Sequence, residues 1–180
     1  DVKPDIITFA KGITCGYAPI GGVIVTKEIA DYFNDHVLYC GLTYSAHLLG
    51  CAAGIAMIDV YKEEKIFENV KKMEPVLKGE LLKLKSKHKS LGDVRVMGLF
   101  GMIELIKNTK TKEALVPYGM DPEGTMKKIV RMLLDKGYNT YSHENCISVS
   151  PPLIINEDQI KEGLAILDDV LDYIDTLVEE

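Results

Sequence analysis

The stretch PDIITFAKGITCGYAPIGGVIV, residues 4–25, decides the fold. It holds a short apolar run at residues 6–10, then Lys11, then a second run at residues 23–26. Runs of this length, rich in β-branched residues, predict strands, and the lack of polar alternation predicts that the first is buried on both faces. Four glycines separate the two runs: Gly12, Gly16, Gly21 and Gly22.

The rest of the chain alternates predicted helices and strands. Residues 27–33 predict a short helix, and the small apolar residues at 48–58 predict a helix that is buried nearly all round. An amphipathic pattern then continues to residue 84, with a break or kink expected at Pro75. Further along come paired strands at 93–107, a helix at 125–136 ended by Gly137, a strand at 146–150 and a final helix capped by Asn156 and Gln159.

Composition excludes several classes of protein. The 180 residues include 21 basic and 27 acidic side chains, a net charge of −6, and 47% are hydrophobic. This mixture is too apolar for a disordered chain, and its acidic balance argues against nucleic acid, which requires a basic face. No uncharged apolar run reaches the ~18 residues that indicate a membrane span, and the first residues show no signal peptide. We therefore expect a cytoplasmic globular protein that binds neither nucleic acid nor membrane.

The cysteines predict reduced thiols. The four cysteines, Cys15, Cys40, Cys51 and Cys146, form no Cys-x-x-Cys pair and no regular disulfide framework. Without a secretory signal, they are expected to be reduced. A metal site could be assembled from Cys40, His47 and Cys51, but no fourth ligand has suitable spacing. Small buried side chains are the preferred interpretation, and no metal is expected.

Lys11 is the candidate for chemistry. It follows the predicted buried strand, and ligands gather beyond the C-terminal ends of strands in parallel α/β sheets. A desolvated amine there would be a nucleophile able to form a Schiff base, and the glycines beyond it would admit a bulky ligand. The alternative is a lysine at a strand end that simply extends into water. The residue pattern alone favours this second interpretation.

Residues 4–25 closely resemble, without a gap, the cofactor-lysine segment of class III (omega-type) aminotransferases, which are fold type I pyridoxal-phosphate enzymes. Two later segments resemble the same family in the same order. They are LTYSAH at residues 42–47, followed by Cys-Ala-Ala at 51–53, and SPPLIIN at residues 150–156. Together with residues 92–105, the resemblance covers essentially the whole chain and changes the interpretation of Lys11.

The resemblance implies roles for individual residues. Lys11 would bind pyridoxal 5′-phosphate through a Schiff base and then move protons on the amino substrate. Thr43 would reach across a homodimer interface and donate its hydroxyl to the phosphate of the other subunit's cofactor. Tyr44 is a further candidate for cofactor binding, although an ordinary turn with satisfied hydroxyls at Tyr44 and Ser45 is about as well supported.

The substrate-binding side of the pattern is altered. Many relatives bind a substrate carboxylate through an arginine in the C-terminal region, with two parallel hydrogen bonds. Residues 138–145, YNTYSHEN, contain no arginine, and Tyr141 or His143 takes that position. We take His143 as the candidate substrate-binding residue. Arg95 lies in a segment that could approach the site, but a surface role is favoured for it.

Ala46 and Leu48 replace the usual glycine and proline of the family, which are mild changes.

A larger departure is that several family features are missing from this chain. In the family, the acid that pairs with the pyridinium nitrogen, the phosphate-binding loop and the aromatic residue that stacks on the ring all precede the lysine strand. This chain begins ten residues before Lys11, so all three would lie upstream. We therefore expect the C-terminal half of an enzyme, as a fragment, a separately encoded half or a remnant.

The predicted architecture is an α/β, fold type I transferase. Residues 1–56 would end the large cofactor domain, residues 57–74 would form a bridging helix, and residues 75–180 would form the small C-terminal domain. The reaction would move an amino group from an amino donor to a 2-oxo acid, and the isolated chain is expected to be inactive. Two alternatives stay open: a non-catalytic oligomerising or binding module, and the same fold used for decarboxylation, racemisation or aminomutation.

Overall fold

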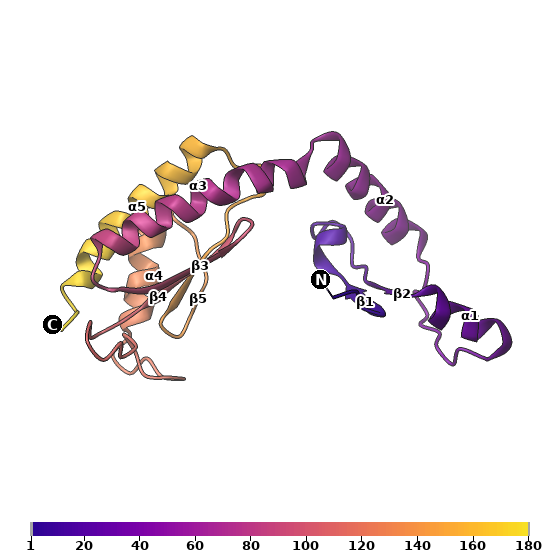
Figure 1. The fold of residues 1–180 in the computed structure, drawn as a ribbon, viewed down its shortest axis with the longest axis horizontal. Coiled ribbons are helices and arrows are strands. Elements are labelled where there is room, and N and C mark those ends of the chain that lie inside the picture. The colour runs from indigo at the N-terminus through magenta and orange to yellow at the C-terminus, as the bar shows by residue number, and fades with distance from the viewer. Residues whose placement is uncertain (1, 180) are drawn as a thin grey trace. The chain divides into compact units, whose positions relative to one another are not determined.

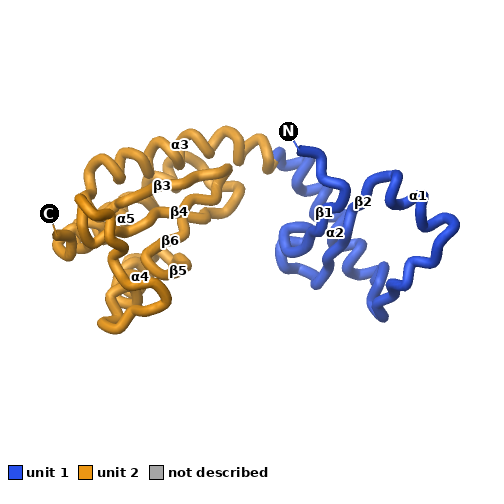
Figure 2. The backbone as a smooth tube through the Cα atoms, turned by 60° about the horizontal axis from the view of Figure 1, so that its bottom comes forward, with its two compact units in different colours: residues 1–65 blue, residues 66–180 orange. Residues whose placement is uncertain are grey.

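The computed structural model describes residues 2–179 and divides into two units, residues 1–65 and residues 66–180 (Figure 2). In Figure 1 the first unit carries β1, β2, α1 and α2, and the second carries the remaining elements. The division coincides with the end of one helix and the start of the next. Among the described residues, no helix is both long and apolar enough to cross a membrane.

Unit 1 is built on a two-stranded ribbon. Strand β1 (Ile6–Phe9) pairs with β2 (Gly22–Val25), and the 3₁₀ turn η1 (Lys11–Ile13) follows β1 directly. Helices α1 (Lys27–Asp35) and α2 (Leu48–Glu63) complete the unit. The two strands and two helices lie where the sequence predicts them, although both helices extend further, to Asp35 and Glu63, and the turn η1 was not predicted. The pairing is antiparallel because a loop without a crossover helix connects the strands, whereas the expectation for a ligand site assumed a parallel sheet.

The burial predicted for unit 1 is wrong for the described chain. All four residues of β1 are exposed, and in α2 only Gly50 and Gly54 are buried. Apolar side chains expected in a core are open to solvent, such as Ile24 at 57% and Leu49 at 74% exposed. The reason is that β1 and β2 pair only with each other, and no second apolar layer among residues 2–65 covers them.

Unit 2 combines a four-stranded sheet with three helices. The strand order is β3-β4-β6-β5, and every neighbouring pair is antiparallel. Helix α3 packs against both β3 and α5. The strands are β3 (Leu91–Met97), β4 (Phe100–Leu105), β5 (Ser142–His143) and β6 (Cys146–Val149). The helices are α3 (Ile66–Lys87), α4 (Thr125–Asp135) and α5 (Glu157–Asp175).

Burial of helix faces against the sheet gives unit 2 its core. Leu81 of α3, Ile103 of β4 and Leu167 of α5 are each 0% exposed. Every buried hydrophobic side chain of the described chain belongs to this unit. Burial of this kind is the dominant favourable term in folding, so residues 66–180 carry their own source of stability.

Local signals in the sequence set the helix ends of unit 2. The Asn156 side chain accepts a hydrogen bond from the Gln159 amide at 2.9 Å, and the Gln159 side chain accepts one from the Asn156 amide at 3.1 Å, which confirms the predicted capping box. Gly137 has the left-handed φ of +88° expected just beyond α4. Of the break or kink predicted at Pro75, the break does not occur: α3 continues through it as one helix, with buried residues on both sides, Met73 and Leu77.

Candidate active site

Lys11 lies in the turn that follows β1. The strand ends at Phe9, and Lys11 is the first residue of η1. Its side chain is exposed, and among the described residues no hydrogen bond or ion pair engages its amine. Lys11 therefore has the strand-end position that the sequence predicts, with an amine free to form a bond to a ligand.

The backbone of this turn is unusual for non-glycine residues. Lys11 has a φ of +52° and Cys15 a φ of +48°, both in the left-handed region that side chains with a Cβ rarely enter. Thr14, which is buried, closes the turn: its amide donates to the Lys11 carbonyl at 3.2 Å, and its hydroxyl donates to the Ala18 carbonyl at 2.6 Å. The direction in which Lys11 leaves the strand thus depends on a strained turn.

Helix α2 contacts the same turn through Tyr61. The Tyr61 hydroxyl donates to the Gly12 carbonyl at 2.7 Å and lies 3.0 Å from the Cys15 Sγ atom. Two helical turns earlier, a Cβ at Gly54 would lie 3.8 Å from the Cγ1 atom of Ile13. The sequence reasoning missed Tyr61. Its spacing of seven residues from Gly54 places both on one helix face, and that pattern could have pointed to a contact.

Thr43 and Tyr44 lie in the turn that precedes α2. Both are exposed, Tyr44 to 77%, and its ring centroid is 5.6 Å from that of His47. Tyr44 lines a hollow of about 830 Å³ together with residues 17–21, which follow the Lys11 turn in sequence. The side chains of Thr43 and Lys11 do not line this hollow. Unit 1 thus places Tyr44 beside the glycine-rich segment, while Thr43 lies on the same exposed turn outside the lining of this hollow.

The two mild departures from the family pattern have a structural meaning. Ala46 has a left-handed φ of +54°, which glycine adopts without steric cost. Leu48 is the first residue of α2, the position where proline is favoured because its missing N–H has no helical partner there. At positions 46 and 48 the backbone therefore keeps the conformations that suit glycine and proline, although the residues there are alanine and leucine.

The candidates for the missing arginine lie at β5 in unit 2. Tyr141 is 66% exposed and lines a hollow of about 670 Å³ whose wall includes Ser148 and Pro152. His143 is also exposed, is paired opposite Cys146 in the sheet and does not line that hollow. The role of His143 in binding substrate stays a prediction.

Both arginines of the chain are engaged in ion pairs on the surface of unit 2. Arg95, at 64% exposure, contacts the carboxylates of Asp93 and Glu104, and its Nε atom is 2.8 Å from Asp93 Oδ2. Arg131 lies 2.8 Å from Asp135 on the same helix. The surface role favoured for Arg95 agrees with these contacts.

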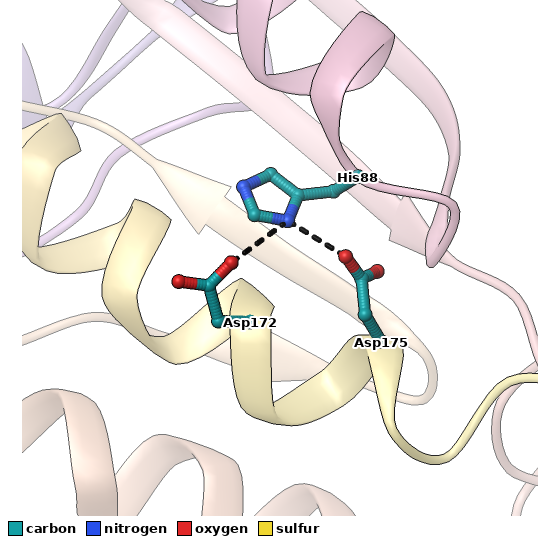
Figure 3. A group of neighbouring side chains, drawn as sticks. All are labelled: His88, Asp172 and Asp175. Carbon is teal, nitrogen blue, oxygen red and sulfur yellow. Dashed lines mark hydrogen bonds and ion pairs between the residues drawn. The ribbon is translucent and has the colours of Figure 1, made fainter.

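A buried histidine joins α3 to α5. The side chain of His88 is 1% exposed, and its Nδ1 atom lies 2.9 Å from Asp175 (Figure 3). Its Nε2 atom lies 2.6 Å from Asp168. Asp172 is farther from Nδ1, at 3.8 Å, and its side chain is 64% exposed. Asp175 also accepts a hydrogen bond from the Ser90 amide at 2.9 Å. This cluster therefore ties the end of α3 and the start of β3 to the last turns of α5.

The three residues considered for a metal site do not come together in the described part of the chain. Within the described residues, the one group of three ligand-type side chains close enough to share an ion is His88, Asp172 and Asp175. Both nitrogens of His88 already lie at hydrogen-bond distance from carboxylates, which accounts for the cluster as a structural junction. Cys40, His47 and Cys51 do not form such a group among those residues.

Comparison with known proteins identifies the family of this chain. A model of the family described as "Aminotransferase class-III" matches residues 1–171. The chain belongs to the class III aminotransferase family. A solved structure of taurine:2-oxoglutarate aminotransferase from Bifidobacterium kashiwanohense, in complex with PLP and glutamate, superposes with a TM-score of 0.92 at 48% identity. That match covers 98% of this chain and 39% of the other.

Curated relatives of this class III chain differ in their named reactions. An ethanolamine-phosphate phospho-lyase homolog from Caenorhabditis elegans is 34% identical over 93% of this chain and 35% of its own length. The adenosylmethionine-8-amino-7-oxononanoate aminotransferase of Methanocaldococcus jannaschii is 36% identical over 88% of this chain and 34% of its own. The chain therefore spans little more than a third of these relatives. Its fold is the corresponding part of a fold type I PLP-dependent transferase.

Replacing Asp175 with asparagine is expected to lower the free energy of unfolding at pH 7 by about 1–3 kcal/mol, because Ser90 and His88 lose a charged acceptor. Burial raises the pKa of Asp175, but hydrogen bonds from Ser90 and His88 outweigh burial and hold this pKa below its usual value. The ionised carboxylate therefore stabilises the fold above the unfolded pKa, and this contribution is lost as pH falls through the folded one. Urea denaturation from about pH 7 to about pH 3 measures both effects.

The matched control is Asp172→Asn, because Asp172 is exposed and lies 3.8 Å from the same ring. We expect it to change stability by less than about 0.5 kcal/mol. Equal losses in the two variants, or a loss in Asp175→Asn that does not shrink in acid, would show that the cluster does not hold α3 to α5.

Proposed function

We propose that residues 1–180 form the C-terminal part of a pyridoxal-phosphate-dependent aminotransferase. In the complete protein, Lys11 would carry the cofactor, and an amino group would pass from an amino donor to a 2-oxo acid. The observation that carries the proposal is the free amine of Lys11 in the turn after β1, within the segment that matches the family. The isolated chain is expected to be inactive.

The residues of unit 1 fit this cofactor chemically. An exposed primary amine without a partner suits covalent attachment to an aldehyde, and an exposed threonine hydroxyl suits donation to a phosphate oxygen. When bound, pyridoxal phosphate supplies the electron sink that makes the substrate Cα–H acidic. Lys11 would then accept and return the proton at its Nζ atom, Thr43 would hold the phosphate, and Tyr44 would bound the loop next to it.

The proposal includes an organisation for the complete protein. Residues 1–56 would end the large domain, residues 57–74 would bridge, and residues 75–180 would form the small domain. A homodimer is proposed because Thr43 would serve the cofactor of the other subunit. The apolar side chains of the β1–β2 ribbon are exposed, which supports the proposal that further polypeptide covers them in the complete protein. A cytoplasmic location is supported by the four unpaired cysteines.

For the substrates, we propose a small primary amine that carries an anionic group, with 2-oxoglutarate as acceptor. Support comes from the 48% identity to the taurine:2-oxoglutarate aminotransferase. His143 is proposed to contact the anionic group, with Tyr141 as the alternative. Either side chain donates a single hydrogen bond, whereas an arginine would form two parallel ones.

The relative named as a phospho-lyase homolog favours one second candidate, a lyase reaction on an amino phosphate. Product analysis separates the two reactions. An aminotransferase forms a new amino acid from the 2-oxo acid, whereas a phosphate-eliminating lyase releases inorganic phosphate without an acceptor.

Substituting Lys11 by alanine in the complete protein is expected to lower kcat with taurine and 2-oxoglutarate by about 10³-fold or more, because the proton-transferring amine is removed. Glutamate formation in a coupled assay measures this. Lys3→Ala, which alters an exposed lysine that precedes the same strand, should leave kcat unchanged. Retention of activity in Lys11→Ala, or turnover by residues 1–180 alone, would contradict the proposal.

Replacing Thr43 by valine preserves the shape of the side chain and removes its hydroxyl. We expect the Kd of the complete apoprotein for pyridoxal phosphate to rise about tenfold or more, since a hydrogen bond to a charged oxygen is lost. Fluorescence titration with the cofactor measures the Kd. Thr43→Ser, which keeps the hydroxyl, should bind nearly as the wild type does. An equal rise of the Kd in both variants would show that the Thr43 hydroxyl does not bind the phosphate.

A further inference from the structure

We propose that Tyr61 is a positioning residue for Lys11: its hydroxyl holds the turn from Gly12 to Cys15, and the turn sets the direction in which the lysine amine leaves the strand. The inference rests on the proposed role of Lys11. Neither the sequence pattern nor the family resemblance pointed to Tyr61, and it emerges from contacts between α2 and η1.

The turn needs support from outside itself. Lys11 and Cys15 both have left-handed backbones, with φ values of +52° and +48°. Non-glycine residues stay in such conformations only where the surrounding contacts over-determine them. The hydrogen bonds made by Thr14 lie inside the segment, on the carbonyls of Lys11 and Ala18, so they close the turn without fastening it to the rest of unit 1.

Tyr61 supplies that fastening. Its hydroxyl donates to the Gly12 carbonyl at 2.7 Å, across 49 residues of sequence. Among the described residues, no other side chain from a different element makes a hydrogen bond to residues 11–16. The Gly12 carbonyl belongs to the peptide plane between Gly12 and Ile13, so the Tyr61 hydrogen bond fixes that plane, one residue beyond Lys11.

The Tyr61 hydroxyl contacts two groups of the turn. It donates its proton to the Gly12 carbonyl at 2.7 Å. Its oxygen also lies 3.0 Å from the Cys15 Sγ atom, whose thiol is 3.7 Å from the same Gly12 carbonyl. The hydrogen bond with Cys15, burial and the nearby Cys15 charge raise the pKa of Tyr61 to about 12, so the phenol remains a donor at neutral pH.

The expected consequence concerns the chemical step. Rate depends steeply on the placement of a catalytic group relative to the reacting atoms, whereas substrate binding uses other contacts. Loosening the turn should therefore lower kcat with little change in KM. The turn should also exchange its amide hydrogens faster, whether or not substrate is present.

The test uses the complete protein with pyridoxal phosphate bound. Tyr61→Phe removes the hydroxyl and keeps the ring, and we expect kcat to fall about 3- to 10-fold with KM within about twofold, as the loss of one or two hydrogen bonds predicts. Hydrogen exchange by mass spectrometry should show faster exchange in the peptide that contains residues 10–16. Tyr118→Phe, at an 86% exposed tyrosine of unit 2, is the matched control and should match the wild type in every measurement.

A second variant separates the two contacts of the Tyr61 hydroxyl, one with Gly12 and one with Cys15. Cys15→Ala keeps Tyr61 and its bond to Gly12, so kcat should fall no more than about twofold. A fall as large as in Tyr61→Phe would assign the effect to Cys15 and overturn the inference. Tyr61→Phe with wild-type kcat and wild-type exchange in the turn would also overturn it, as would faster exchange spread evenly over α1 and α2, which marks a general loss of stability.

Failure of the proposed function gives a different result. If the wild-type complete protein shows no visible absorption band from lysine-bound cofactor, the role of Lys11 is wrong. If the wild type shows the band and Tyr61→Phe leaves kcat and exchange unchanged, the role of Lys11 stands and that of Tyr61 falls.

Discussion

Burial of apolar side chains organises residues 66–180, whereas the described residues of unit 1, which carry the Lys11 turn, contain no buried hydrophobic side chain. Leu81, Ile103 and Leu167 form part of a closed core in unit 2, while Ile24 and Leu49 in unit 1 face solvent. Because residues 2–65 bury no large apolar side chain, hydrogen bonds of the backbone and a few side chains hold the turn that carries the candidate residue Lys11. The contacts around η1 therefore matter more than they would in a tightly packed domain.

The local elements could be predicted from the sequence because their signals are local. The Asn156–Gln159 capping box and the left-handed Gly137 depend on neighbours within a few residues, and both appear as expected. Burial could not be predicted in the same way. The apolar runs at β1 and α2 indicate an environment that residues 2–65 do not supply, so the strand and helix predictions were right and their predicted surroundings were wrong.

In the candidate site, too, features that depend on neighbours in sequence could be predicted, whereas contacts between distant residues could not. The roles proposed for Lys11 and Thr43 come from resemblance to a family, and Lys11 has the expected position at the end of a strand. Tyr61 was missed because its contact with Gly12 joins residues 49 apart, and neither periodicity nor a short motif reports such a distance. The structure also explains why the substitutions at positions 46 and 48 are mild. Ala46 and Leu48 keep the left-handed and first-helical-turn positions for which glycine and proline are suited.

The central claim is that the turn after β1 presents Lys11 as the attachment point for a cofactor. The most direct measurement is borohydride reduction of the complete protein with pyridoxal phosphate, followed by peptide mass spectrometry. The account predicts one stable phosphopyridoxyl group, located on Lys11. Attachment at a different lysine, or no attachment under conditions in which the protein is folded, would contradict it.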